Sequence, residues 1–119
     1  MISFSTILII LAMHTIFDWF LQSRMVAENK SKSWLALEEH VFIYFIGLLI
    51  AMFILPFDAA NGFIWAVVNA VLHFITDAIT SRVNAYSYQR GRIKCFWNGI
   101  GFDQYIHYVT LFGTYLLLK

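Results

Sequence analysis

Long apolar stretches alternate with short polar ones along this chain. The pattern predicts four helices, at about residues 2–22, 34–55, 62–81 and 96–118. Each has the roughly 20 residues that a helix needs to cross a bilayer. Three polar connections separate them, and Pro56 marks the end of the second helix. The sequence therefore predicts a single all-α domain over residues 1–119, a four-helix transmembrane bundle.

The first apolar stretch could be mistaken for a signal peptide, because N-terminal apolar segments are often of that kind. It has no positively charged start and no small-residue cleavage site, and it contains His14 and Asp18. A segment that is removed has no use for such side chains. We therefore interpret it as a retained helix.

Basic residues predict the orientation of the bundle. Seven of the eight lie in the first and third connections; they are Arg24, Lys30, Lys32, Arg82, Arg90, Arg92 and Lys94. Lysine and arginine are enriched in the cytoplasmic loops of membrane proteins. We therefore expect these connections in the cytoplasm, with both termini and the Pro56 turn on the non-cytoplasmic side.

Composition supports a membrane protein and argues against a nucleic-acid partner. The chain is 61% hydrophobic and 13% charged, whereas soluble domains carry about 25% charged residues. A net charge of +1 supplies no basic surface for nucleic acid. The single cysteine, Cys95, cannot form an internal disulfide. The expected partner is membrane lipid, and a homodimer stays open.

Each predicted helix nevertheless carries polar side chains inside its apolar stretch. In three helices a histidine and an aspartate stand four residues apart, which places them on one helix face. The ionisable residues of this kind are His14, Asp18, His40, His73, Asp77, Asp103 and His107. Uncharged polar residues near them are Gln22, Tyr44, Asn69 and Gln104. A purely structural apolar bundle would not need this set.

The polar residues of all four helices lie at a similar depth. Counted from the nearest basic residue, most lie about 12–15 Å inside the cytoplasmic boundary, and His107 lies deeper. Helices of opposite direction thus place them in one layer. H-T-I-F-D in the first helix also resembles H-F-I-T-D in the third, which favours two repeated helix hairpins that meet at this layer.

Buried charge in this layer calls for compensation. An aspartate in a bilayer core costs about 2.5–3.5 kcal/mol on insertion scales, and no lysine or arginine lies within the predicted spans. One or two divalent metal ions would neutralise the aspartates. Imidazole and carboxylate ligands suit zinc, manganese, iron or nickel better than calcium, and we favour zinc. The seven ionisable residues are the candidate ligands, and the four uncharged polar residues are candidates to orient them.

Three other interpretations stay open. The polar groups could hold the helices together as hydrogen bonds worth about 0.6 kcal/mol each. They could form a path for protons or metal ions, although almost no polar residue continues it in the helices beyond His14 and Tyr44. Two histidines could ligate a haem, which the neighbouring aspartates disfavour. A metal centre accounts for the matched depth and the charges together.

The motifs also resemble those of a known family. The ordered set His14-x3-Asp18, Asn29-Lys30, Leu37-x2-His40, His73-x3-Asp77 and Asp103-Gln104-x2-His107 is similar to an uncharacterised family, a domain of unknown function, of small bacterial and phage integral membrane proteins. The similarity covers nearly the whole chain. More distantly, the His-x3-Asp helices are similar to membrane-bound metal-dependent hydrolases related to the inner-membrane protein YdjM. The resemblance implies a multi-pass protein of the bacterial inner membrane, with a phage origin open, and a metal site made by these histidines and aspartates.

The predicted function is intramembrane, metal-dependent hydrolysis in the cytoplasmic half of the bundle. A metal ion would lower the pKa of a bound water and polarise a phosphoryl or acyl oxygen. An aspartate that is not a ligand could take the proton. The depth of the layer favours a lipid or phosphoester substrate. The alternatives are a proton or metal-ion transport component, or a non-enzymatic membrane interaction protein with a structural metal or hydrogen-bond site.

Overall fold

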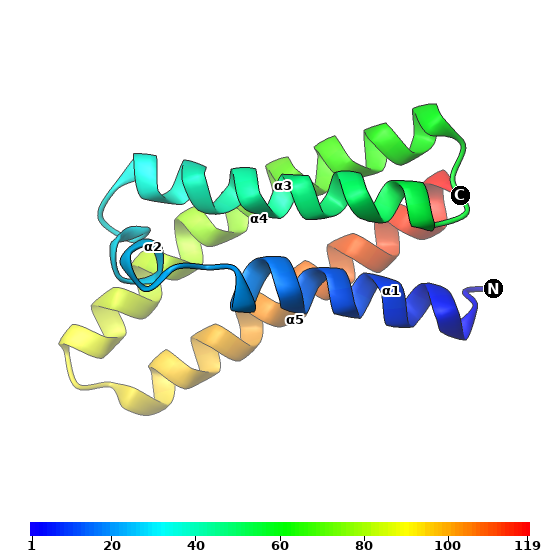
Figure 1. The fold of residues 1–119 in the computed structure, drawn as a ribbon. Helices are drawn as coiled ribbons and strands as arrows, with labels where there is room; N and C mark the ends of the chain where they lie inside the picture. Colours follow the sequence, from blue (N-terminus) through cyan, green and yellow to red (C-terminus); the bar gives the residue numbers. More distant parts are fainter.

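The computed structural model describes residues 1–119 as an all-helical protein (Figure 1). Its elements are α1 (Phe4–His14), the π-helical segment η1 (Thr15–Phe20), α2 (Arg24–Asn29), α3 (Trp34–Ile54), α4 (Ala59–Gln89) and α5 (Ile93–Leu118). Both termini and the α3–α4 turn lie at one end of the molecule, and α2 and the α4–α5 turn lie at the other. The Lys119 ammonium donates to the Met1 carbonyl at 2.8 Å. The two basic connections therefore share one end, as expected.

Short side chains and backbone constraints begin and end the long helices. The Ser33 hydroxyl caps α3, and the Asp58 carboxylate caps α4 by accepting from the Asn61 N–H at 3.0 Å. Leu55 has the extended conformation that a following proline imposes, so α3 stops before Pro56. Gly91 ends α4 with a positive φ of 69°, the usual way for a glycine to terminate a helix.

The first helix changes character halfway along its length. The Leu21 N–H donates to the Ile16 carbonyl at 2.9 Å, a five-residue spacing that widens the turn. The segment ends at Phe20, so the predicted helix over 2–22 was too long and Gln22 lies in the following turn. Asp18 is buried within this π-helical segment. Such segments are often found at functional sites.

The third helix and the connections differ from the prediction. The expected helix over 62–81 extends from Ala59 to Gln89, which is 31 residues. The expected loop from Arg82 to about Cys95 is therefore mostly helix. No glycine or proline lies between Ser81 and Gly91, so the helix continues past the apolar stretch. The first connection was likewise predicted without structure, but it contains α2.

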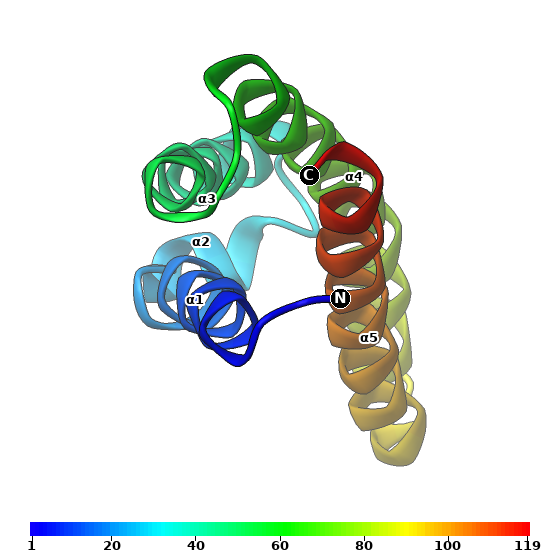
Figure 2. The ribbon, with the colours of Figure 1, turned by 90° about the vertical axis from the view of Figure 1, so that its right-hand side faces the viewer.

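The helices pack as two layers of unequal length. Figure 2 shows α4 and α5 side by side, with α1 and α3 on one side of this pair. Ten buried apolar residues form the core between them, including Ile10, Leu48, Trp65 and Leu111. The Trp65 indole donates to the Leu111 carbonyl at 3.1 Å. These core residues lie in the half of the bundle that is nearer the chain termini. The buried polar residues lie in the other half, next to the basic connections.

The outer surface is strongly apolar. Large apolar side chains are exposed on all four long helices, among them Phe4, Phe53, Ile79 and Leu117. Such a surface is typical of contact with lipid or another protein. However, only α3 and α4 are both long and apolar enough to cross a membrane, and about 33% of each such stretch is buried inside the protein. The structure therefore supports two candidate spans, not the four that were predicted, and the apolar part from Phe4 to Phe20 is shorter.

Candidate metal centre

Five elements bring the predicted ionisable residues into one buried cluster. His14 ends α1, and Asp18 lies in η1. His40 is in the second turn of α3, and α4 and α5 supply two residues each. All seven are at most 9% exposed; they are His14, Asp18, His40, His73, Asp77, Asp103 and His107. The four-residue spacing that the sequence analysis singled out thus corresponds to inward-facing positions.

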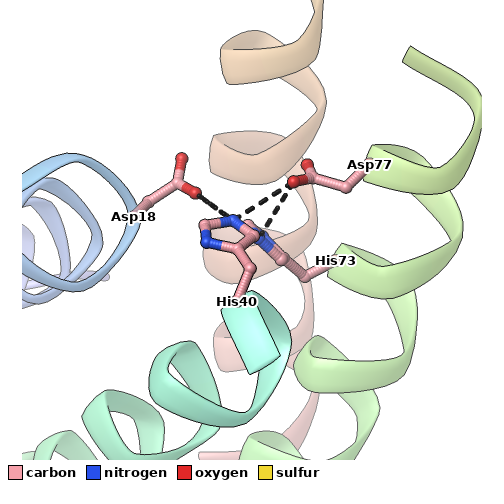
Figure 3. Close-up of side chains that lie close together, drawn as sticks. All are labelled: Asp18, His40, His73 and Asp77. Atoms are coloured by element: carbon pink, nitrogen blue, oxygen red, sulfur yellow. Dashed lines mark hydrogen bonds and ion pairs between the residues drawn. The ribbon is translucent and has the colours of Figure 1, made fainter. Parts of the chain in front are cut away.

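Asp18, His40, His73 and Asp77 form the tighter part of the cluster (Figure 3). His40 Nε2 lies 3.0 Å from Asp18 Oδ1, 3.2 Å from Asp77 Oδ2 and 3.1 Å from His73 Nε2. His73 Nε2 lies 3.4 Å from Asp18 Oδ1 and 3.7 Å from Asp77 Oδ2. Two imidazole nitrogens therefore lie between two carboxylates from different helices. We call these four residues the first ligand group.

These separations match the spacing of ligands around a metal ion. With zinc–ligand bonds of about 2.0–2.1 Å, neighbouring atoms of a tetrahedral site lie about 3.3–3.4 Å apart. Five of the six separations in the first ligand group range from 3.0 to 3.7 Å. The same atoms also lie within hydrogen-bond range of one another. The geometry is compatible with a metal site and leaves the type of metal open.

Asp77, Asp103 and His107 form a second ligand group. His107 Nε2 lies 3.0 Å from Asp77 Oδ1 and 3.3 Å from Asp103 Oδ2. Asp77 therefore belongs to both groups and directs a different oxygen to each. This is the arrangement of a carboxylate that can bridge two neighbouring ions.

Aromatic stacking holds the imidazole planes in place. The His73 ring lies between Tyr44, at a centroid distance of 3.9 Å, and His107, at 4.2 Å. Both contacts are nearly parallel, with interplanar angles of 16° and 25°. The Nε2 atoms of His73 and His40 face the carboxylates, and their Nδ1 atoms have no hydrogen-bond partner. The stack restricts rotation of the His73 ring about its side chain.

His14 is buried beside the two groups but belongs to neither. Its Nδ1 lies 2.9 Å from the Tyr44 hydroxyl, and its Nε2 lies 2.8 Å from Gln104 Oε1. Its distance to Asp18 Oδ2 is 3.4 Å. Both ring nitrogens are thus occupied by neutral partners. His14 is thus hydrogen bonded within the cluster, and its predicted role as a metal ligand stays a prediction.

Gln104 connects the elements around the cluster. Its amide nitrogen donates to Asp18 Oδ2 at 3.0 Å and to Asp103 Oδ2 at 3.2 Å. Its carbonyl oxygen accepts from the Trp19 indole at 3.3 Å. Gln104 and Tyr44 thus contact the ionisable residues, and their orienting role stays a prediction.

The two remaining uncharged candidates lie outside these contacts. Asn69 donates to the Trp65 carbonyl and to the Thr114 hydroxyl, within the apolar half of the bundle. Gln22 makes no recorded hydrogen bond through its carbonyl oxygen, although that atom is buried. Asn69 thus packs in the apolar half, whereas His73 and Asp77 on the same helix join the cluster.

Two residues of the site were not anticipated. The Lys30 ammonium donates to Asp77 Oδ2 at 2.9 Å, so a basic residue from outside the predicted spans compensates one of the aspartates. Lys30 lies outside every span and reaches Asp77 only because α2 folds back over the cluster. The Thr80 hydroxyl, one turn after Thr76 on α4, hydrogen bonds to Asp103 Oδ1. Thr80 stands four residues after Thr76 and three after Asp77, so it lies near the same helix face as Asp77. A threonine in an apolar stretch does not by itself indicate a functional site.

A cavity of about 550 Å³ adjoins the cluster at the basic end of the molecule. Asp18 and Asp103 line its inner wall, together with Gln104. Lys30 and Lys32 from the first connection also line it. The cluster is thus accessible to a ligand that enters from this end. The volume is in the range of ordinary small-molecule sites.

The fold and the site define an all-helical protein with a buried histidine–aspartate cluster compatible with metal binding. The chain belongs to the family described as protein of unknown function (DUF3307), whose pattern matches residues 6–118. This confirms the expected membership of an uncharacterised family. No curated protein and no solved structure matches the chain. The similarity to membrane-bound hydrolases stays a prediction.

Proposed function

We propose that this protein is a membrane-embedded, metal-dependent hydrolase with a two-metal centre that acts on a phosphoester or lipid substrate. The observation that carries the proposal is the position of Asp77. Its Oδ2 faces His40 and His73, and its Oδ1 faces His107. Two-metal hydrolases place their ions about 3.5–4 Å apart, a distance that one carboxylate can bridge.

The charges and atom types of the cluster fit divalent cations. Three carboxylates face one lysine ammonium. With the neutral imidazoles that metal binding requires, two negative charges remain uncompensated. A first divalent ion would neutralise them, and a second would need an anionic ligand beside it. Zinc suits imidazole and carboxylate donors at this spacing, and manganese, iron and nickel are the other candidates.

The residues around the centre can perform the remaining steps of a hydrolysis. A bound divalent ion would supply Lewis-acid polarisation and a more acidic water. Asp103 lines the cavity and is the most exposed of the seven residues, at 9%. As a member of the second ligand group, it would hold an ion on the substrate side of the centre. Gln104 holds Asp103 and Asp18 in position through its amide nitrogen.

We further propose that all four long helices lie in the bacterial inner membrane. The stretch from Phe4 to Phe20 has 17 residues and is apolar, which gives a length of about 25 Å. On α5, Phe102, Tyr105 and Val109 are exposed, which suits a lipid-facing side. The basic connections would face the cytoplasm. The cavity would then open on the cytoplasmic side.

The test is elemental analysis of the full chain purified in mild detergent. We expect up to two metal equivalents per chain in the wild type. Asp77→Asn should lose most of both, because Asp77 serves both groups, whereas His40→Ala and His107→Ala should each lose mainly one. Asn69→Ala is the matched control: it removes a buried polar side chain of the same helix that does not touch the cluster. Its metal content should equal that of the wild type.

Absence of metal binding would refute the proposed function. A monodisperse wild type that binds no zinc, manganese, iron or nickel after exposure to each would refute the proposal. The cluster would then be a hydrogen-bond network that holds the helices together. If metal is bound, release of phosphate from phosphoesters is measured next, and it should be lost in Asp77→Asn.

Transport is the main alternative, and the packing disfavours it. A path for ions needs polar groups across both halves of the bundle. Toward the termini the interior is filled by Ile10, Leu48 and Leu111. The polar side chains there, Asn69 and Thr114, are hydrogen bonded to each other. Proton or metal flux in vesicles without hydrolysis would favour transport over the proposed enzyme.

A further inference from the structure

Lys30 is the one basic side chain that contacts the buried cluster. It follows α2, a short helix that begins at the Ser23 cap and packs through Val26, which is 1% exposed. Its ammonium lies 2.9 Å from Asp77 Oδ2, and its side chain is only 20% exposed. It also lines the cavity beside the cluster. Lys30 is therefore held at the boundary between the cluster and the space that a ligand would occupy.

The contact of Lys30 conflicts with metal binding at the same atom. Asp77 Oδ2 faces both His40 Nε2 and His73 Nε2, so it is an oxygen of the first ligand group. A cation bound there and the Lys30 ammonium would share one oxygen and repel each other. Two positive centres at this distance are stable together when an anion lies between them. The arrangement thus creates a place for a negatively charged ligand.

The cavity wall supplies further groups for such a ligand. The Ser81 hydroxyl and the Gln22 carbonyl oxygen are buried at the cavity and have no hydrogen-bond partner. The Asn84 side chain lines the same space. A buried polar atom without a partner is unfavourable unless a ligand or water satisfies it. The Ser81 hydroxyl and the Asn84 amide can therefore donate to oxygen atoms of a ligand, whereas the Gln22 oxygen requires a donor such as water.

The balance of charge indicates how negative the ligand is. Two divalent ions and the Lys30 ammonium would exceed the three carboxylates by two positive charges. A phosphate monoester near neutral pH carries close to two negative charges. Its several oxygens could contact an ion and Lys30 at once. An uncharged ester would leave the excess uncompensated.

We propose that Lys30 is the counter-ion of Asp77 in the metal-free protein and binds the phosphoryl group of a phosphate monoester in the metal-loaded protein. The cavity lined by Lys30, Gln22, Ser81 and Asn84 is then the site for that group. This inference rests on the proposed metal-dependent function and names the substrate class and a binding residue for it. Lys30 would be a substrate-binding residue, because it contacts the phosphoryl oxygens directly.

The proposal predicts opposite effects on two binding equilibria. Lys30→Met removes a competitor of the metal, so manganese(II) should bind more tightly, which electron paramagnetic resonance of free manganese measures. The same variant removes a charge-assisted contact to the anion. Inorganic phosphate, followed by broadening of its phosphorus resonance by bound manganese, should therefore bind on the order of tenfold more weakly. A residue that only stabilises the fold would weaken both.

Lys32→Met is the matched control. Lys32 also lines the cavity, but it makes no ion pair with the cluster. We expect the manganese affinity of this variant to equal that of the wild type and its phosphate affinity to change less than in Lys30→Met. Lys30→Arg, which keeps the charge, should retain phosphate binding. Weaker manganese binding in Lys30→Met, or unchanged phosphate binding, would overturn the proposal.

A measurement on the wild type covers the case in which Lys30→Met does not fold. Phosphate that engages Lys30 must tighten manganese binding, because coupling between two ligands is reciprocal. Manganese binding that is indifferent to phosphate would overturn the role of Lys30 and leave the metal centre intact. A wild type that binds no metal would instead overturn the proposed function, and this inference with it.

The source of the phosphate group is tested with vesicles. The protein is reconstituted with phosphatidic acid in phosphatidylcholine, or with phosphatidylcholine alone. Tighter manganese binding in the vesicles that contain phosphatidic acid would assign the group to a lipid headgroup. Tightening by inorganic phosphate but not by phosphatidic acid would assign it to a water-soluble ester. The absence of tightening in both arms would overturn the proposal.

Discussion

Gly47 allows α3 to pack closely against η1, and a methyl group there should disturb both the fold and the first ligand group. A Cβ at this position would lie 2.5 Å from Phe17 Cδ2 and 2.9 Å from Phe17 Cβ, against 3.4–4 Å for ordinary contact. In Gly47→Ala the two elements must therefore separate by about 1 Å. Rotation of the ring cannot relieve a contact that includes Phe17 Cβ.

Gly113 provides a control for the change in helix propensity. Replacing a helical glycine by alanine stabilises a helix by about 0.5–1 kcal/mol. A Cβ on Gly113, in α5, would meet no atom within 4 Å. The difference between Gly47→Ala and Gly113→Ala therefore isolates the steric term, which we expect to destabilise by about 1–3 kcal/mol. The thermal unfolding midpoint of each variant in the same detergent measures it.

The same displacement should reach the candidate metal centre. Phe17 directly precedes Asp18, whose Oδ1 lies 3.0 Å from His40 Nε2 on α3. A shift of about 1 Å would spread the first ligand group beyond metal-bond reach, because ligand positions must hold within about 0.5 Å. Asp103 and His107 lie on α5 and would keep their positions. Gly47→Ala should therefore weaken metal binding in the first group alone.

Two results would contradict the predicted effects of Gly47→Ala. Equal unfolding midpoints and equal metal contents in Gly47→Ala and Gly113→Ala would show that Phe17 does not pack against Gly47. Lower stability with full metal content would show that this contact supports the fold without positioning Asp18.

Three further predictions concern the surroundings of the cluster. Gln104→Leu removes hydrogen bonds to His14 and Asp18, and metal affinity measured by titration should fall about 10–100-fold. Removal of metal by a chelator should lower the unfolding midpoint, since a ligand at 100 times its Kd stabilises by about 2.7 kcal/mol; an unchanged midpoint would indicate that the metal does not stabilise the fold. Arg82→Gln loses the guanidinium that lies 4.1 Å from the Trp34 ring centroid, and unfolding should show a loss of about 0.5–1 kcal/mol without a change in metal content.

The apolar pattern predicted the long helices with different success. The second was placed at 34–55 and is observed at Trp34–Ile54, because a serine cap and a proline mark its two ends. The third was placed at 62–81 but extends to Gln89. Apolar residues report where a helix is buried or in contact with lipid, whereas helix propensity decides how far it continues. The polar residues after Ser81 therefore placed the predicted end of the third helix too early, although the segment was correctly predicted to be a helix.

The location of the candidate site was predictable because burial of a charged residue is unfavourable in any environment. A histidine or aspartate inside an apolar helix must face other polar groups, and all seven such residues are buried together. The contact of Lys30 with Asp77 could not be predicted in this way. It depends on α2 folding back across the helix ends, a tertiary arrangement that spacing along the chain does not contain. Its role as a counter-ion reduces the charge that a metal must neutralise.

The four-residue spacing of histidine and aspartate led to two different arrangements. On α4, a regular α-helix, His73 and Asp77 both join the first ligand group. On the first helix the π-helical segment begins at Thr15, directly after His14. Asp18 Oδ1 there faces the imidazoles of His40 and His73, and Asp18 Oδ2 lies 3.4 Å from His14 Nε2. The ring nitrogens of His14 bond to Tyr44 and Gln104. The two similar sequence segments therefore contribute unequally to the first ligand group: the segment on α4 supplies two of its members, and the segment on the first helix supplies one.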